Sequence, residues 1–500
     1  MTPQQLRNSI LQMAIEGKLT EQRAEDGNAS DLLKEIKAEK AKLIAEKKIK
    51  KEKSLPEISE NEIPFEIPDN WVWVRLGDIV SKLTDGSHNP PANSGSGYKV
   101  ISAMNIKKGK IVLDNVIRFT DEIGFEKENL RTQIKRGDII IGIIGGSIGN
   151  LAYYNHDEKV IAQRSIAIID SLIDNYYVGN TLLSPFIQGI MKKSSGTAQG
   201  GIYLGTLKSL LVPMPPLSEQ KRIVARLEEI LPQVDEYEKA YNELQELNKK
   251  FPDNLKNSLL QMAIEGKLVE QRAEDGNARD LLKEIQTEKA KLIAEKKIKK
   301  EKPLPEISED EIPFEIPDNW VWCYINDIAF VTKLAGFEYT KNIFPNLQVD
   351  GIPLFKGKNV QNGHLVYDFD GYIPEEISDS LPRSQIVNRC LLTPYVGTIG
   401  NIAIFNGEFK AHLGSNVGKI EIFNRTKLHI MEEYVLYYLR CKTGYKELTK
   451  YKKATAQESI SIEAIRNVII PIPPLAEQKR IVAKLEQILP LCDELSKEYK

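Results

Sequence analysis

The clearest pattern of apolar positions along the chain lies between Glu219 and Phe251. Apolar residues recur there at alternating steps of four and three, with one position skipped before the last residue. They are Ile223, Leu227, Ile230, Val234, Tyr237, Tyr241, Leu244 and Phe251. This period of 3.5 predicts a long helix that packs along a partner helix. The end of the chain repeats the pattern at Ile481, Leu485, Ile488, Cys492, Leu495 and Tyr499. Because proline lacks an amide hydrogen, Pro232 and Pro490 are expected to kink or interrupt these helices.

A second helical pattern covers Asp31 to Lys53. Its apolar seam runs through Leu33, Ile36, Lys40 and Leu43, and returns as Leu282, Ile285, Lys289 and Leu292. Glu and Lys fill the remaining positions at helix-pairing spacings. Each copy ends in the run AEKKIKKEK, at 45–53 and 294–302. This run is either a solvated helix end, favoured by the helix dipole, or a basic handle near DNA phosphates.

These patterns belong to an internal repeat. Residues 8–73 return as 257–322 with seven differences in 66 positions, and 212–232 return as 470–490. The first offset is 249 residues and the second 258, so the intervening segments, 74–211 and 323–469, differ in length by nine. Their sequences differ almost everywhere. Repeated spacers indicate a shared mechanical role, whereas divergent segments indicate two different ligands. The alternative is a recent duplication followed by drift, but drift blurs spacers and inserts alike.

Composition narrows the protein class only modestly. The chain has 500 residues, 41% hydrophobic and 28% charged, with a net charge of −2, which favours a multidomain protein with no global basic field. The two divergent segments are more basic than the rest: 74–211 has 16 basic and 12 acidic residues, and 323–469 has 17 and 15. The four cysteines are scattered, so neither a zinc site nor a disulfide framework is indicated. With no signal peptide and no apolar run long enough for a membrane span, we expect a cytoplasmic protein with no membrane partner.

Motifs for chemistry are absent or incomplete. Asn89-Pro90-Pro91-Ala92 comes close to the motif of an adenine methyltransferase, but Ala92 cannot stack on a base. Residues 351–359 come close to a phosphate-binding loop but have one residue too many and end in Asn. We interpret both as ordinary loops. The histidines show no metal-ligand spacing, and the Trp pairs 71/73 and 320/322 alternate as on a strand that faces the core. The chain is therefore expected to be non-catalytic.

Several motifs together resemble a known family. The segment PDNWVWVRLGDI (68–79) opens the first domain, and IPIPPLAEQKRIV (470–482) closes the second and opens a long helix. The segments RGDIIIGIIGGSIGN (136–150) and NRCLLTPYVGTIGN (388–401) lie inside the two domains. Each segment ends in a Thr-Ala-Gln element before a proline pair. In this order the motifs resemble the specificity subunit of type I restriction-modification systems over essentially the whole chain.

The resemblance implies an α+β fold with two α/β target-recognition domains, separated by two long antiparallel coiled-coil regions with an approximate twofold. It implies an N-terminal helical region (1–53), recognition domain 1 (54–217), a central helical spacer (218–302), recognition domain 2 (303–475) and a C-terminal helix (476–500). Since the chain stops at Lys500, short of a counterpart to 242–251, this last helix is expected to be the shorter one, unless residues 3–19 complete it.

The resemblance also implies function and partners. Each domain reads one half of a split site on double-stranded DNA, and the helices set the unread gap. Two modification subunits bind S-adenosylmethionine and methylate adenine N6, and two restriction subunits use ATP and Mg. The chain itself is then expected to bind no cofactor and no metal. A coiled-coil scaffold with two protein-binding modules remains the alternative.

Candidate DNA contacts are polar or basic residues near turns, because such side chains reach base edges and phosphates. In domain 1 the polar stretch LTDGSHNPP (83–91) resembles the family's DNA-facing loop. The domain 1 candidates are Lys82, Thr84, Asp85, Gly86, Ser87, His88, Asn89, Asn105, Lys107, Lys108, Ser147, Gln163, Arg164, Thr197 and Gln199. The domain 2 candidates are Lys333, Gly336, Glu338, Tyr339, Lys341, Lys356, Lys358, Asn359, Thr398, Asn416 and Gln457.

Overall fold

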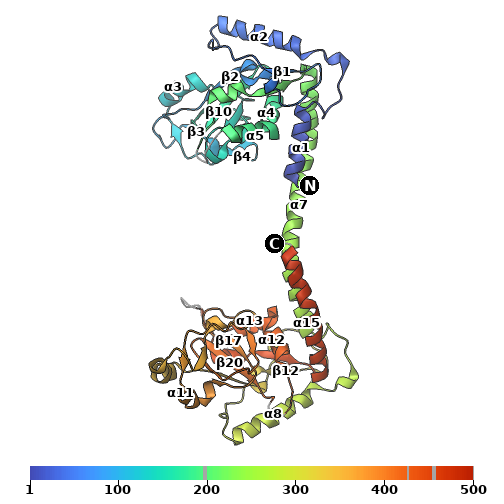
Figure 1. The fold of residues 1–500 in the computed structure, drawn as a ribbon, viewed down its shortest axis with the longest axis vertical. Helices are drawn as coiled ribbons and strands as arrows, with labels where there is room; N and C mark the ends of the chain where they lie inside the picture. Colours follow the sequence, from blue (N-terminus) through green and yellow to red (C-terminus); the bar gives the residue numbers. More distant parts are fainter. Residues whose placement is uncertain (195–199, 425–426, 453–457, 499–500) are drawn as a thin grey trace. The chain divides into compact units, whose positions relative to one another are not determined.

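One long helix, α7 (Leu217–Ile264), belongs to both halves of the chain (Figure 1). The computed structural model describes residues 1–194, 200–424, 427–452 and 458–498. These residues form two compact units, Met1–Leu244 and Gln245–Lys500, and each contains the start or the end of α7. Among the described residues, no helix is both long and apolar enough to cross a membrane.

In the first unit, α1 (Pro3–Ile15) packs beside α7 (Figure 1). Tyr237 donates a hydrogen bond to the carbonyl of Met1, whereas Glu219 accepts one from Gln22, so this segment runs antiparallel to α7. Arg7 forms an ion pair with Asp235 on the same contact. In the second unit, α15 (Leu475–Glu498) pairs with the end of α7 in the same way, and Lys256 bonds to Asp493 at 2.9 Å.

The predicted seam of α7 is buried at its beginning and exposed further along. Ile223 and Leu227 are fully buried and Val234 is 2% exposed, because they pack into the core of the first unit. Leu244 and Phe251 are each 52% exposed. The expectation of a seam packed along its whole length was therefore wrong for the later positions. Tyr499, the last predicted seam residue of the C-terminal copy, lies outside the described residues.

The two prolines do not interrupt their helices, so the expected interruption was wrong, whereas the expected kink stays a prediction. Pro232 lies inside α7 and Pro490 inside α15. Both prolines are exposed, as are Glu228 and Glu486 one turn earlier, whose carbonyls lose the amide partner. Water can satisfy those carbonyls on the exposed face, so the missing hydrogen bond does not break the helix.

The second helical pattern forms α2 (Ala29–Ala45) and α8 (Ala278–Ala294). Asn28 and Asn277 cap these helices. Each packs on its own domain rather than on α7: Ile36 and Ile285 are buried, and Lys40 and Lys289 donate to the carbonyls of Gly77 and Asn326. Both helices end at the first residue of the Lys-rich run. The rest of the run follows the helix and is largely exposed.

Domain 1 is built on a six-stranded sheet of order β2-β10-β7-β8-β5-β4. These strands are β2 (Val80–Asp85), β10 (Ile166–Ser171), β7 (Ile139–Gly142), β8 (Leu151–Tyr153), β5 (Lys110–Ile111) and β4 (Ile106–Lys107). A three-stranded sheet joins β6 (Phe119–Thr120), β3 (Tyr98–Ile101) and β9 (Val160–Ala162), and β1 (Val72–Arg75) pairs with β11 (Leu211–Met214). Helices α3 (Glu122–Thr132), α4 (Asn175–Leu183), α5 (Pro185–Ser194) and α6 (Leu204–Ser209) complete the domain.

Domain 2 repeats the order of the first four strands of the six-stranded sheet although its sequence has diverged. The strands β13 (Ala329–Lys333), β20 (Val417–Ile422), β17 (Cys390–Pro394) and β18 (Ala403–Phe405) follow the order β2-β10-β7-β8. A second sheet joins β15 (Tyr372–Ile373), β14 (Ile352–Phe355), β19 (Ala411–Leu413) and β16 (Gln385–Ile386), and β12 (Val321–Tyr324) pairs with β21 (Ile469–Ile472). Its main helices are α12 (Glu432–Arg440) and α13 (Lys442–Thr449), with shorter α9 (Ile325–Ile328), α11 (Glu375–Asp379) and α14 (Ile462–Arg466). The expected α+β class with two recognition domains is confirmed.

A buried carboxylate connects each domain to its long helix. Glu219, at the start of α7, accepts a hydrogen bond from the indole of Trp71 at 2.8 Å and is fully buried. Glu477 on α15 accepts one from Trp320 at 2.9 Å and is buried in the same way. Burial raises the pKa of both carboxyl groups. The prediction that the Trp pairs face the core is confirmed for Trp71 and Trp320, whereas their neighbours in the pairs are half-buried.

Candidate DNA-recognition surface

The polar loop that follows β2 is held tightly against the end of β9. The amide of Ser87 donates to the carbonyl of Ala162 at 2.7 Å, and Ser87 is 3% exposed. A Cβ on Gly86 would lie 2.1 Å from the carbonyl oxygen of Gln163, so the position requires glycine. Arg131 donates to the carbonyl and to the carboxylate of Asp85. The loop is therefore a rigid edge, and it begins after Asp85 rather than at Leu83 as the sequence indicated, because 80–85 form β2.

The candidates around this loop have different surroundings. Lys82 donates to the buried carboxylate of Asp138 at 2.6 Å and to the carbonyl of Gln133 at 2.8 Å. Thr84 lies in β2, half-buried. His88 contacts the carboxylate of Asp85 at 2.7 Å but stays exposed, and Asn89 is exposed next to it. His88 and Asn89 are therefore open to a ligand, whereas the ammonium group of Lys82 is engaged inside the domain.

The next candidates lie on a hairpin formed by β4 and β5. Asn105 ends the short helix η4 (Ala103–Asn105), accepts a hydrogen bond from the amide of Ser102 at 2.9 Å and donates to the carbonyl of Val112 at 3.2 Å. Its side chain thus holds the two ends of the hairpin together. Lys107 and Lys108 are exposed at the tip, where Lys108 has a φ of 47°.

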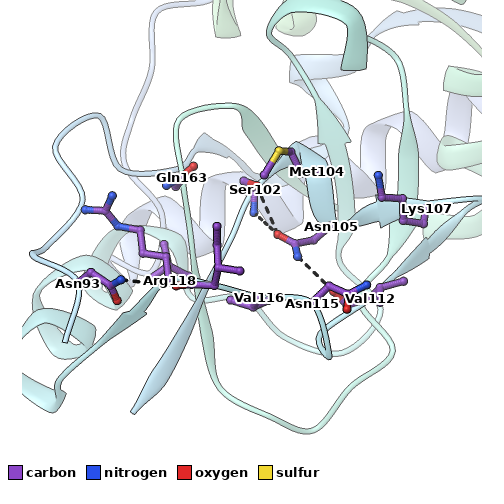
Figure 2. A pocket seen from close by; sticks show the side chains of 12 residues that line it. Asn93, Ser102, Met104, Asn105, Lys107, Val112, Asn115, Val116, Arg118 and Gln163 are labelled. Atoms are coloured by element: carbon purple, nitrogen blue, oxygen red, sulfur yellow. Dashed lines mark hydrogen bonds between the residues drawn. The ribbon is translucent and has the colours of Figure 1, made fainter. Parts of the chain in front are cut away.

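A cavity of about 460 Å³ lies beside this hairpin (Figure 2). Five of its lining residues carry amide or hydroxyl groups, two are cationic, and among the described residues that line it none is acidic. The polar lining residues are Asn93, Ser102, Asn105, Asn115, Gln163, Lys107 and Arg118. Amide side chains and cations are the groups that contact base edges and phosphates in protein–DNA complexes. The structure therefore brings together three candidates, Asn105, Lys107 and Gln163.

The other candidates of domain 1 are more dispersed. Ser147 lies in η5 (Gly145–Ser147), where its hydroxyl donates to the carbonyl of Ile144 at 2.7 Å. Arg164 is exposed directly after Gln163. Thr197 and Gln199, with the first Thr-Ala-Gln element, lie outside the described residues, as do Gln457 and the second element in domain 2.

Domain 2 has the same hairpin frame with a different lining. Asn359 ends η10 (Gly357–Asn359), accepts from the amide of Lys356 at 2.9 Å and donates to the carbonyl of Val366 at 2.9 Å. Lys356 bonds to Asp370 at 2.6 Å, and this hydrogen bond holds the pKa of the Asp370 carboxyl below its usual range. Lys358 is exposed, 3.2 Å from the same carboxylate. The expectation of a loop over 351–359 was wrong for 352–355, which form the largely buried strand β14.

The remaining candidates of domain 2 have different surroundings. The ammonium of Lys333 lies 4.4 Å from the ring centroid of Tyr395, which is a cation–π contact. Glu338 accepts from Arg383 at 2.8 Å. Gly336 and Glu338 lie in α10 (Gly336–Glu338), and Tyr339 and Lys341 in the helical turn η8 (Tyr339–Ile343). Thr398 and Asn416 are exposed, and Asn416 has a φ of 64°.

Sequence reasoning missed four of the seven polar residues that line the domain 1 cavity, and it also missed Met104. The four are Asn93, Ser102, Asn115 and Arg118. A signal for the hairpin was present. Both domains contain Asn, then Ile or Val, two variable residues and Gly, at 105–109 and 359–363. The two glycines have φ values of 73° and 92°, which favour glycine at the turn. This shared pattern would have aligned the divergent segments. Among the described residues, no group of His, Cys, Asp and Glu side chains could hold a metal ion.

Comparison with known proteins identifies the family. The family described as "Type I restriction modification DNA specificity domain" matches residues 68–248 and 317–500. The chain is 28% identical to the EcoAI specificity subunit and 29% identical to the EcoEI specificity subunit, both from Escherichia coli and both type I restriction enzymes. Each alignment covers 98% of this chain and 89% of the relative.

More distant proteins are also similar. The MjaVIII specificity subunit from Methanocaldococcus jannaschii is 22% identical over 84% of this chain and 87% of its own length. The crystal structure of the HsdS subunit from Thermoanaerobacter tengcongensis superposes with a TM-score of 0.45 at 20% identity, covering 87% of this chain and 93% of that one. With two family matches that together span most of its length, the chain belongs to the type I restriction-modification specificity subunits.

Proposed function

We propose that each recognition domain reads one half of a split DNA site, and that the chain supplies sequence recognition to partner subunits that perform the chemistry. The observation that carries this proposal is the contrast inside the two domains. Their strand order and hairpin frame are the same, whereas the side chains around the frame differ in charge and shape. Two domains that recognise different DNA sequences can share one fold but need different side chains at the contact surface.

The partners follow from the family and from the surface of the helices. Leu247 and Phe251 on α7 are 66% and 52% exposed. Apolar residues on an exposed helix face are typical of a surface that binds another protein. We propose that modification subunits dock on these helices, two per chain, with S-adenosylmethionine bound in them. Two restriction subunits would then supply the ATP- and Mg-dependent steps. In this arrangement the chain itself binds no cofactor and works in the cytoplasm, where the DNA lies.

A domain exchange tests the proposal. Residues 74–211 are replaced by the corresponding segment of another specificity subunit, and the complex is expressed with its modification subunit in a host that lacks adenine methylation. Mapping of N6-methyladenine across the genome then gives the methylated motif. We expect one half of the motif to change and the other half to stay.

The matched control is the reciprocal exchange of residues 323–469, which should change the other half only. An unchanged motif after both exchanges would contradict the proposal. A chain that shows no salt-sensitive DNA binding together with its modification subunit would instead favour the scaffold function, since phosphate contacts always make binding salt-dependent.

A further inference from the structure

The amide side chains around the domain 1 cavity fall into two groups. Asn93 accepts from the amides of Gly95 and Phe119, at 3.2 and 3.0 Å, and Asn105 bridges the hairpin. These two are engaged by the fold. The side chains of Asn115 and Gln163 have no hydrogen-bond partner among the described residues, although both line the cavity. Their donors and acceptors are therefore available to a ligand.

Gln163 is attached to rigid backbone on both sides. Its own amide donates to the carbonyl of Ile101 at 2.8 Å, and the next amide, that of Arg164, donates to the carbonyl of Ser87 at 3.0 Å. The backbone that bears the Gln163 side chain is thus fixed to the end of β3 and to the loop after β2. Figure 2 shows Gln163 among the residues that line the cavity. A side chain whose backbone is fixed and whose polar group has no partner in the fold can bind one edge of a ligand specifically.

Domain 2 shows which of these positions belong to the frame. In domain 1, Gln163 follows β9, which pairs in parallel with β3, and its backbone amide donates to the last residue of β3. In domain 2, Gly414 follows β19, which pairs in parallel with β14, and its amide donates to the carbonyl of Phe355, the last residue of β14, at 2.7 Å. Gly414 therefore occupies the position of Gln163. A Cβ there would lie 2.8 Å from the carbonyl oxygen of Phe355, so domain 2 excludes a side chain at this position.

The rest of the lining changes in the same way. Asn105 is retained as Asn359 with the same hydrogen bonds, but Met104, one position earlier, corresponds to Lys358. Arg118 corresponds to Gly371, since their carbonyls accept from Val100 and Leu354 at equivalent places in β3 and β14. The asparagine of the frame is kept, whereas Gln163, Met104 and Arg118 are replaced. Arg118 donates to the carbonyl of Pro91 at 2.7 Å and so belongs to the fold of domain 1. A purely structural role for Gln163 and Met104 would keep them as it keeps the asparagine.

We propose that Gln163 reads an adenine in the half-site of domain 1. This inference rests on the proposed function, because it assumes that domain 1 contacts DNA. In the major groove, a glutamine amide accepts a hydrogen bond from adenine N6 and donates one to N7. Met104, which is 69% exposed at the cavity rim, provides an apolar contact for a thymine methyl group. Lys107, exposed and without an ion pair among the described residues, lies where it can contact a phosphate.

The test uses Gln163→Ala and Gln163→Glu in the complete complex with the modification subunit, with genome-wide mapping of N6-methyladenine. We expect the Ala variant to relax one position of one half-site, with the preference for adenine there falling on the order of 10- to 100-fold. The Glu variant carries only acceptors, so its preference at that position should move from adenine to cytosine, whose N4 is a donor.

Lys358→Ala is the matched control, because it alters the equivalent rim of domain 2. It should leave the domain 1 half-site unchanged. Melting temperatures of the two Gln163 variants should match that of the parent, since Gln163 makes no side-chain hydrogen bond that the fold would lose. If both Gln163 variants methylate the parental motif, the inference is overturned. The proposed function survives that result if exchange of 74–211 still changes the half-site.

Discussion

Arg480 holds Asp275 through two parallel hydrogen bonds, from Nη1 to Oδ1 at 2.7 Å and from Nη2 to Oδ2 at 2.6 Å. The residues are far apart in the sequence, and the pair joins the start of α15 to the loop that precedes α8. The first unit has the same pair between Arg222 and Asp26. Because the planar guanidinium matches the carboxylate, these pairs fix the register of helix and loop in both units.

The first prediction concerns this pair and pH. The hydrogen bond from Arg480 lowers the pKa of the Asp275 carboxyl, so the folded state holds the ionised form more strongly than the unfolded state does. The stability from this group is therefore present above its ordinary pKa, near 4, and is lost as pH falls through the lowered value. Asp275→Asn should lower the free energy of unfolding by about 2 kcal/mol at pH 7.

Urea unfolding between pH 7 and pH 3 checks this prediction. The difference between parent and Asp275→Asn should shrink as the pH falls, because protonation removes the charge from the parent as well. Glu477, whose pKa is raised by burial, contributes in the opposite direction, so Glu477→Gln provides the comparison. A difference that stays constant over this range would show that the ion pair contributes no pH-dependent stability.

The second prediction separates two lysines that the sequence could not distinguish. Lys82 is bonded to the fully buried Asp138, whereas Lys107 is exposed at the hairpin tip. Lys82→Met should lower the free energy of unfolding by about 3 kcal/mol, since it leaves a buried carboxylate without its partner. Lys107→Ala should leave the melting temperature unchanged and reduce the salt dependence of DNA binding by about one charge. Equal melting temperatures for the two variants would contradict this assignment.

The third prediction concerns the loop after β2. A Cβ at Gly86 would meet the backbone oxygen of Gln163 at 2.1 Å, and backbone cannot rotate away as a side chain can. Gly86→Ala should therefore displace the loop after β2, weaken recognition of the half-site that domain 1 reads, and lower methylation of the target site. Gly146→Ala is the control, because a Cβ there has no atom within 4 Å among the described residues. Methylation assays with the two purified complexes, together with their melting curves, make the comparison; similar activities would count against a rigid loop.

The sequence predicted the helices and the two-domain division well, because these depend on local periodicity and on the repeat. Burial of Ile223 and Leu227 follows directly from the seam. The contact of Glu219 with Trp71 could not be predicted, since the residues lie 148 positions apart and both copies of the repeat are nearly identical. Identical copies contain no compensating changes, so they give no information on which residues touch.

The candidate site was predicted less well, for a different physical reason. Asn105, Asn115 and Gln163 are all polar residues near turns, and residue type alone makes them equal candidates for DNA contact. What distinguishes them is whether the fold already uses their hydrogen bonds, and for Asn105 the partners are backbone groups of Ser102 and Val112. Only the folded chain shows that Asn105 is engaged and that Gln163 is not.

The last prediction concerns the length of α7. If this helix sets the gap between the two half-sites, an insertion of seven residues between Gln245 and Asn248 should widen the gap. Seven residues add two helical turns, about 10 Å, which corresponds to at most about three base pairs. A seven-residue insertion also preserves the heptad phase, so exposed side chains such as Leu247 keep their place on the helix face. Mapping of N6-methyladenine should show both half-sites unchanged and a wider spacer, whereas a Glu246→Ala control keeps the parental spacer. An unchanged spacer in an active insertion variant would show that the helix does not set the gap.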